Sequence, residues 1–203
     1  MENKNVSEKY NCIVLLGPTA VGKTSIGVSI AHHYGQPVIS ADSRQTYKGL
    51  DIGSGKDISE YTVEENLPDG TVKKVEIPYY LIDIATLDKE YNVFNYQQDF
   101  YRTFNELTAA NENAVPGKKC VPVVIGGTGM YLDSVIRGYD FIPVEENKEL
   151  RAELEKKSLE ELDEMLLKLK PDLHNKSDLV LRDRVVRAIE IALFILYPMN
   201  FGK

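Results

Sequence analysis

The sequence predicts an α/β fold in which a parallel sheet is flanked by helices, with a small helical insertion in the second half. Apolar runs of strand length alternate with helical stretches over residues 11–138, and a glycine-rich turn joins the first run to the first helix. Alternating strands and helices imply a parallel sheet with right-handed crossovers. The 203 residues are 43% apolar and 27% charged, which is typical of one globular domain with a small appendage.

The first elements surround the turn GPTAVGKT at residues 17–24. The unbroken apolar run 11–16 predicts a strand buried on both faces, and residues 23–34 predict the helix that follows, closed by Gly35. The turn fits G-x-x-x-x-G-K-[ST], and a strand before it with a helix after it is the context that this motif requires. The sheet is therefore predicted to be P-loop NTPase-like.

Three further apolar runs predict buried strands of the same sheet. They are residues 37–43, 77–84 and 120–127. Between the last two, residues 92–111 predict a helix, because Phe94, Tyr101, Phe104 and Leu107 recur at helical spacing.

Residues 60–77 interrupt this alternation. Two mostly polar strand-like runs flank the turn signal Pro68-Asp69-Gly70, so they predict a β-hairpin inserted at the margin of the sheet.

The character of the chain changes after residue 138. Residues 146–170 predict one or two charged amphipathic helices, with a capping box at Ser158 and Glu161 and a stop at Pro171. Another helix is expected from about Asp178. The predicted organisation is a P-loop core at 1–138, a helical insertion or lid at 139–178, and a core helix at 179–203.

Composition narrows the class of protein. The polar segment 1–10 and the lack of any bilayer-length apolar run predict a cytoplasmic protein. Cys12 and Cys120 are expected to be small buried hydrophobes, and the three histidines, His32, His33 and His174, lack metal-ligand spacing. The formal charge of −7 argues against indiscriminate nucleic-acid binding but is compatible with a specific RNA site.

The glycine-rich turn carries the clearest chemistry. Gly17 and Gly22 allow the backbone to approach phosphate oxygens, Lys23 supplies a positive charge, and the Thr24 hydroxyl is placed to ligate Mg²⁺. The motif leaves open whether the bound group is a nucleotide such as ATP or another diphosphate.

Two aspartates end predicted strands. Asp42 is expected to face the phosphates across the crevice at the carboxyl ends of the strands, where it could take a proton from an attacking hydroxyl or amine. Alternatively, Asp42 caps a turn with Ser43. Asp83 is either a residue that orients a metal ion or a turn residue at a strand end.

Two other motifs offer polar groups. Thr128, in the turn IGGTGMY, is expected to point toward the same crevice. Arg184 and Arg187 lie one helical turn apart, so they either reach one anionic partner together or are simply solvated.

Taken in order, five segments resemble the tRNA dimethylallyltransferases, over about residues 11–191. They are GPTAVGKT, SADSRQTYKGLDIGSGK, LIDI, VIGGTGMYL and RVVRAIE. The resemblance implies transfer of a dimethylallyl group from dimethylallyl diphosphate to the exocyclic amine of the adenosine beside the tRNA anticodon. It also implies Mg²⁺ as the ion, a lid at 139–178 that faces the anticodon stem-loop, and a monomer for the complete enzyme.

The resemblance assigns roles by position. Asp42 would be the general base, with Thr128 and Arg184 holding the leaving group and substrate. The implied diphosphate-binding residues are Gly17, Thr19, Ala20, Val21, Gly22, Lys23 and Thr24. The implied tRNA-binding residues are Asp42, Ser43, Arg44, Gln45, Arg151, Arg184 and Arg187.

The chain departs from the family pattern in four places. It has GSGKD at 53–57 where the family has GTAKP, Tyr79-Tyr80 where the family has two histidines, and the hairpin at 60–77 is extra. Family members also continue well beyond the RVVRAIE helix. Because the final helix is apolar on most sides, we expect a fragment whose last helix is covered by further sequence or by a partner chain.

Three other functions are compatible with the same residues. The first is prenylation of free AMP, ADP or ATP. The second is a small-molecule kinase that binds ATP in the loop, with Asp42 activating a hydroxyl. The third is a binding module that retains affinity for tRNA or a diphosphate without turnover.

Overall fold

The structure, a computed structural model, describes residues 10–114, 119–171 and 181–197. The chain divides into two compact units, Met1–Asp140 and Phe141–Lys203.

The first unit is built on a four-stranded sheet with the strand order β1-β6-β2-β5. The strands are β1 (Ile13–Leu16), β2 (Val38–Ala41), β5 (Tyr79–Tyr80) and β6 (Val123–Gly126). Each neighbouring pair is parallel, with Ile13 opposite Val123 and Val38 opposite both Val123 and Tyr79. Every residue of β2 and β6 is buried, as continuous apolar runs predict for a parallel sheet. The prediction that β1 is buried on both faces is wrong, because β1 lies at the edge of the sheet with Val14 and Leu16 exposed. The predicted fold class is confirmed.

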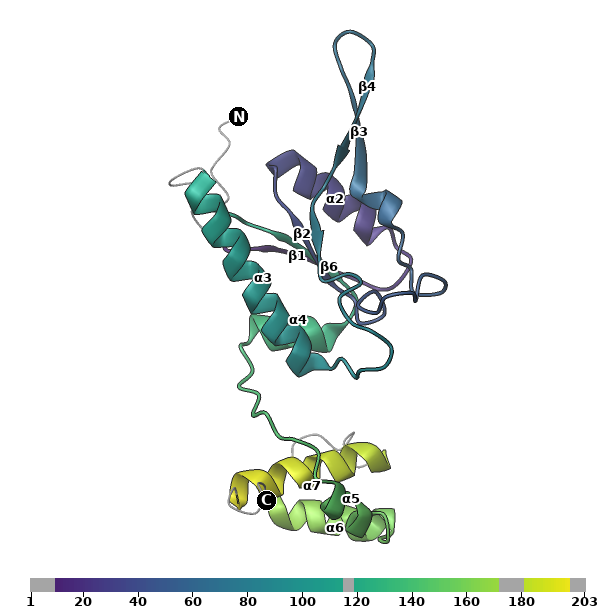
Figure 1. Cartoon of the computed structure of the whole chain (residues 1–203), viewed down its shortest axis with the longest axis vertical. Coiled ribbons are helices and arrows are strands. Elements are labelled where there is room, and N and C mark those ends of the chain that lie inside the picture. The colour runs from purple at the N-terminus through teal and green to yellow at the C-terminus, as the bar shows by residue number, and fades with distance from the viewer. Residues whose placement is uncertain (1–9, 115–118, 172–180, 198–203) are drawn as a thin grey trace. The chain divides into compact units, whose positions relative to one another are not determined.

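Helices cover both faces of this sheet (Figure 1). On one face, α2 (Lys23–Tyr34) packs through Val28 and Ala31 against side chains of β2 and β6. On the other, α3 (Val93–Ala114) and α4 (Gly129–Ile136) pack against the alternate side chains of the same strands. There the rings of Tyr96 and Tyr131 stack with centroids 4.0 Å apart. The sheet is thus held rigidly between two apolar layers, and its carboxyl edge carries the loops of the site.

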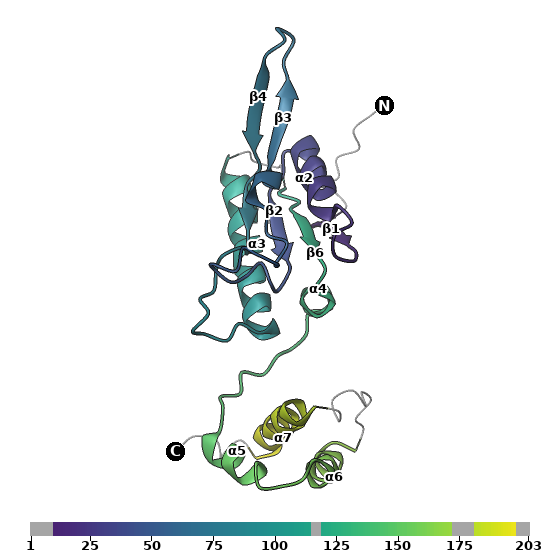
Figure 2. The same cartoon turned by 90° about the vertical axis from the view of Figure 1, so that its right-hand side faces the viewer.

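A short 3₁₀ helix, η1 (Ile58–Tyr61), leads into the predicted hairpin. Its strands β3 (Thr62–Asn66) and β4 (Val72–Glu76) pair antiparallel as a separate sheet, with Gly70 in the left-handed region at φ 83°. Figure 2 shows this hairpin extending beyond the end of the main sheet. The hairpin prediction is confirmed.

The strand predicted at 77–84 is shorter than expected. Only Tyr79–Tyr80 pairs as β5, because Leu81 and Asp83 adopt left-handed backbone angles, φ 63° and 55°, that end the extended conformation.

The second unit contains α5 (Lys148–Leu154), α6 (Leu159–Leu169) and α7 (Arg182–Leu196). Their shared core is entirely aliphatic: Leu154, Leu162, Leu166, Val185 and Ile189. The predicted capping box is present, with the Ser158 and Glu161 side chains each bonded to the other's backbone amide.

The structure groups α7 with α5 and α6, whereas the sequence division assigned 179–203 to the core and 139–178 to a lid. The reason is that Val185 and Ile189 of α7 are buried against α6. The predicted helix start near Asp178, and His174, lie outside the described residues. The role of residues 139–178 as a lid stays a prediction.

Both cysteines carry free thiols in the sheet region, Cys12 partly buried and Cys120 buried, and burial raises the pKa of each. In the segments that the structure describes, no helix has the length and apolar character needed to cross a bilayer.

Gly126 of β6 lies directly opposite Ala41 of β2. A Cβ there would lie 2.2 Å from the backbone oxygen of Ala41, whereas at Gly127 the nearest atom would be 3.4 Å away. We expect Gly126→Ala to lower the free energy of unfolding by about 1–3 kcal/mol, and Gly127→Ala to change it much less. Urea unfolding of the two variants side by side measures this, and equal effects would contradict the packing described.

Candidate functional site

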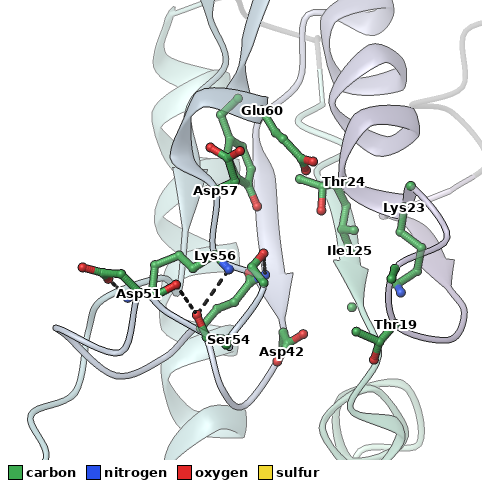
Figure 3. Close-up of a pocket in the computed structure, with 17 residues that line it drawn as sticks. Thr19, Lys23, Thr24, Asp42, Asp51, Ser54, Lys56, Asp57, Glu60 and Ile125 are labelled. Carbon is green, nitrogen blue, oxygen red and sulfur yellow. Dashed lines mark hydrogen bonds and ion pairs between the residues drawn. The ribbon is translucent and has the colours of Figure 1, made fainter.

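A pocket of about 580 Å³ lies where the carboxyl ends of the strands meet the loops that follow them (Figure 3). It is lined by Thr19, Ala20, Gly22, Lys23, Thr24, Asp42, Gln45, Asp51, Gly53, Ser54, Gly55, Lys56, Asp57, Glu60, Tyr61, Ile125 and Gly126. The glycine-rich turn forms one wall, β2 and β6 the floor, and residues 51–61 the opposite wall. This is the crevice where ligands bind in parallel α/β sheets.

The glycine-rich turn is folded as an anion cradle. Ala20 and Gly22 have left-handed backbone angles, φ 62° and 77°, and α2 starts immediately at Lys23. Among the described residues no side chain caps this helix start, so its first amides are available to an anion. The Lys23 ammonium donates to the carbonyl of Pro18, which places its charge over the turn.

Asp42 follows β2 and lines the same pocket as Lys23. Its side chain is 21% exposed, and its Oδ1 accepts the Arg44 amide at 3.0 Å. The turn-capping interpretation is therefore correct in part, because one carboxylate oxygen caps a turn while the group still faces the pocket. Figure 3 shows Asp42 between the turn that carries Thr19 and Lys23 and the loop that carries Ser54. The role of Asp42 as a base stays a prediction.

Thr128 connects the ends of β2 and β6. It precedes α4, its Oγ1 accepts the Ser43 amide at 3.0 Å, and it lies 3.2 Å from the Ser43 hydroxyl. Within the described residues, neither Thr128 nor Ser43 belongs to the pocket lining. The geometry indicates that Thr128 positions the Asp42-Ser43 turn; its predicted contact with the leaving group is untested.

Arg44 and Gln45 face different surroundings. Arg44 is exposed and its guanidinium lies 3.4 Å from Thr19 Oγ1, which links the Asp42 turn to the glycine-rich turn. Gln45 is buried, accepting from Ser40 Oγ and donating to the carbonyl of Gly55 at 3.2 Å. Because both ends of its amide are occupied, Gln45 braces the pocket wall, and Arg44 is the better placed of the two for a contact with RNA.

Lys56 is a site residue that sequence reasoning missed. Its side chain is only 2% exposed, and its ammonium donates to the Tyr47 carbonyl at 3.0 Å, to Asp51 at 2.8 Å and to Asp83 at 2.5 Å. Burial would lower the pKa of this ammonium, but the hydrogen bonds to Asp51 and Asp83 outweigh burial and raise the pKa above 10.5. Lys56 therefore stays charged and ties the wall formed by residues 51–57 to the end of β5.

The same contact decides between the two interpretations of Asp83. Its Oδ1 is occupied by Lys56, its backbone lies in the left-handed region, and it is outside the pocket lining as the structure describes it. Asp83 is thus a turn residue at a strand end. The metal-orienting alternative is not supported.

Acidic and aromatic side chains complete the far wall. Asp57 caps η1 through Ser59, and the carboxylate of Glu60 is directed toward Thr24 in Figure 3. Tyr61 is buried, and burial raises the pKa of its phenol, so that it stays protonated. Across the described residues, no group of three His, Cys, Asp or Glu side chains could hold a metal ion without other ligands.

The charges in the pocket do not balance. The described lining carries four carboxylates, on Asp42, Asp51, Asp57 and Glu60, and two ammonium groups, on Lys23 and Lys56. Lys56 is already paired with two aspartates, and Arg44, outside the lining, lies 3.9 Å from Asp42 Oδ1. A diphosphate would add further negative charge. A divalent cation, which hard oxygen ligands suit, would offset this charge, and the predicted Mg²⁺ stays a prediction.

Two of the three arginines predicted for tRNA contact in the second unit, Arg151 and Arg187, surround one buried carboxylate. Glu190 is fully buried and accepts from Arg151 at 3.1 Å, from Arg187, and from the Asn147 amide at 2.6 Å. Arg151 also pairs with Glu146 at 2.5 Å. Since these carboxylates compensate both arginines, the pair is a structural clamp in this unit, while Arg184 is exposed on the surface of α7.

The Glu190 clamp makes stability depend on pH. Burial opposes the charged carboxylate, but the bonds from Arg151, Asn147 and Arg187 outweigh burial and lower the pKa of Glu190 below 4.5. Its contribution is therefore present above pH 4.5 and is lost as pH falls through the lowered pKa. We expect Glu190→Gln to cost about 1.5–3 kcal/mol at neutral pH and progressively less in acid, measured by denaturation at several pH values. A difference that is independent of pH would contradict this account.

Comparisons with known proteins all identify isopentenyl or dimethylallyl transferases as similar to this chain. The model of the IPP transferase family matches residues 45–199, and that of the isopentenyl transferase family matches residues 10–68. A relative named tRNA dimethylallyltransferase 2, from Treponema denticola, is 47% identical over 188 residues, or 93% of this chain and 56% of that protein. One named tRNA dimethylallyltransferase 1, from Syntrophus aciditrophicus, is 45% identical, covering 90% of this chain and 54% of that protein.

Solved structures agree on the fold. The full-length tRNA isopentenylpyrophosphate transferase from Bacillus halodurans superposes with a TM-score of 0.51 at 29% identity, over 89% of this chain and 54% of that one. A eukaryotic dimethylallyltransferase acting on tRNA gives a TM-score of 0.65 at 22% identity, over 89% of this chain and 40% of that one, and shows the fold alone. The chain spans about half the length of the curated relatives it matches. With most of its residues matched by the family's model, the chain belongs to the IPP transferase family.

Proposed function

We propose that this chain carries the reaction centre of a tRNA dimethylallyltransferase. The reaction transfers the dimethylallyl group of dimethylallyl diphosphate to the exocyclic amine of the adenosine next to the anticodon. The observation that carries the proposal is that Lys23 and Asp42 line one pocket of about 580 Å³. An anion cradle and a carboxylate thus face the same space, which is large enough for a small prenyl donor and part of a nucleobase.

The donor's diphosphate would lie in the glycine-rich turn. The first amides of α2 can donate to its oxygens, and the Lys23 ammonium can exchange the Pro18 carbonyl for a phosphate oxygen. In the reaction the bond between the allylic carbon and the diphosphate oxygen breaks, so the diphosphate leaves with the electron pair. Hydrogen-bond donors that are already directed at that oxygen stabilise the negative charge that develops on it as the bond breaks.

Mg²⁺ fits the oxygen groups on this side of the pocket. The Thr24 hydroxyl, with Glu60 directed toward it and Asp57 nearby, would hold the ion together with the diphosphate itself (Figure 3). When bound, the ion supplies positive charge that neutralises the leaving group. Such an ion would also offset the four acidic side chains of the pocket lining when the anionic donor binds.

Asp42 is proposed as the base on the acceptor side. The adenosine amine forms the new carbon–nitrogen bond and loses a proton, which the Asp42 carboxylate accepts. The Arg44 amide holds Oδ1 at 3.0 Å and thereby sets the direction of the second carboxylate oxygen. Thr128, which follows β6, anchors the residue after Asp42, Ser43, and so fixes the turn that carries the carboxylate.

The acceptor is proposed to be RNA because the relatives at 45–47% identity are named as tRNA enzymes. Free adenylates and a kinase reaction receive no comparable support. Reaching an adenosine within an anticodon loop requires that the base be turned out of its stack into the pocket.

Mass spectrometry of an anticodon stem-loop tests the proposal. The chain is incubated with Mg²⁺, dimethylallyl diphosphate and the RNA, with AMP and ATP as alternative acceptors in parallel reactions. The expected result is one added dimethylallyl group on the stem-loop adenosine and none on the nucleotides. Modification of AMP alone, or no modification while a full-length relative is active under the same conditions, would contradict it.

A further inference from the structure

We propose that Ile52 is an apolar wedge that enters the RNA base stack when the target adenosine turns into the pocket. The inference rests on the proposed function and assigns a positioning role to a residue outside the reacting groups. Its starting point is the exposure of Ile52, whose surface is 99% accessible.

Ile52 stands at the rim of the pocket. Its neighbours on both sides, Asp51 and Gly53, line the pocket, whereas Ile52 itself is outside that lining as described. The Ile52 side chain is therefore exposed to solvent beside the residues that line this wall of the pocket, and in our proposal it lies next to the path of an incoming base. Leu50, two residues earlier, is also exposed at 37%.

The loop that presents Ile52 is anchored from within. Asp51 accepts from the buried Lys56 ammonium at 2.8 Å, and the hydroxyl of Ser54, a buried residue, accepts the Lys56 amide at 3.2 Å. The Gly55 carbonyl is held by Gln45. Gly53 and Gly55, with φ 79° and 69°, give the loop its sharp path. A loop built on these contacts presents its apolar tip in a fixed position.

A fixed apolar side chain suits the gap that an extruded base leaves. Turning a base out breaks its stacking with both neighbours, and proteins that unstack bases commonly insert Leu, Ile, Met or Phe into the opened step. Between the two separated bases, the Ile52 side chain would be buried, whereas in the free protein it is exposed to water.

Isolated exposed hydrophobic residues are common, so exposure alone carries little weight. Ile136 is also exposed, at 63%, but it lies at the end of α4 and lines a different cavity, between α3 and β1. What separates Ile52 is its position between two pocket-lining residues and the buried contacts that hold its loop. Ile136 is therefore a matched control.

The test compares Ile52→Ser with Ile136→Ser on two readouts. The first uses a stem-loop with 2-aminopurine at the target position, whose fluorescence rises when the base unstacks and requires no chemistry. The second is kcat/KM for prenylation of the normal stem-loop and of a short oligonucleotide without stable stacking. Ile52→Ser is expected to lose most of the fluorescence rise and about tenfold in kcat/KM on the stem-loop only. Ile136→Ser should match the unaltered chain throughout.

The two readouts separate this inference from the proposed function. If the unaltered chain prenylates RNA and Ile52→Ser equals it on both substrates, the wedge is overturned while the proposed function stands. If the unaltered chain unstacks the base in an Ile52-dependent manner but never prenylates, the proposed function fails and the wedge stands. Equal losses on the stem-loop and the short oligonucleotide would also overturn the wedge.

Discussion

Asp42→Asn is expected to leave prenyl-donor binding nearly unchanged and to slow RNA alkylation by a factor of at least about one hundred. The amide oxygen of asparagine can still accept the Arg44 amide, which Asp42 Oδ1 accepts at 3.0 Å, so the turn keeps its shape. What is lost is the group that takes the proton from the adenosine amine. Single-turnover rates with saturating donor, together with calorimetric titration of the donor, measure the two effects separately.

Asp69→Asn is a suitable control for this substitution. Asp69 also accepts a backbone amide two residues on, that of Thr71, but it lies in the turn of the β3–β4 hairpin, away from the pocket. The Asp69→Asn variant should alkylate RNA at the rate of the unaltered chain. Undiminished alkylation by Asp42→Asn would remove Asp42 from the role of base.

Lys23→Met is expected to weaken binding of the diphosphate donor by roughly ten- to a hundredfold, the value of one charged hydrogen bond of about 1.5–3 kcal/mol. The fold should not suffer, because the Lys23 ammonium bonds only the carbonyl of Pro18 within its own turn among the described contacts. Calorimetry with an unreactive donor, in which sulfur replaces the bridging oxygen, measures the affinity without turnover.

Lys73→Met provides the comparison for charge alone. Lys73 is exposed on the hairpin and lies 3.9 Å from Glu65, so its loss changes the net charge by the same amount outside the pocket. The affinity of Lys73→Met for the diphosphate donor should equal that of the unaltered chain. Equal affinities for all three proteins would show that the diphosphate does not lie in the glycine-rich turn.

The fold could be predicted in outline because its signals are local. Continuous apolar runs gave β1, β2 and β6, helical spacing gave α3, and the Pro-Asp-Gly turn gave the hairpin. The length of β5 could not be predicted, because it depends on the left-handed backbone of Leu81 and Asp83. Leucine rarely adopts that region, and aspartate does so only in a minority of cases, so neither residue signals the end of the strand.

Those parts of the site that belong to one short sequence motif could be predicted. The glycine-rich turn and the position of Asp42 at a strand end followed from short segments and sheet geometry. The Lys56 network could not be predicted, because the partner of Lys56, Asp83, is 27 residues away in sequence, and the pairing of these two residues depends on how two loops pack. For the same reason the clamp of Arg151 and Arg187 on Glu190 was not predicted: Arg151 was interpreted as an RNA contact, and Arg187 as either an anion-binding residue or a solvated side chain.

A crystal structure of the chain with Mg²⁺ and dimethylallyl thiolodiphosphate, the unreactive donor, would test the central claim most directly. The account predicts that the diphosphate lies against the amides at the start of α2 and Lys23, and that the first allylic carbon faces Asp42 across the pocket. A diphosphate bound in another cavity, or an allylic chain directed away from Asp42, would contradict it.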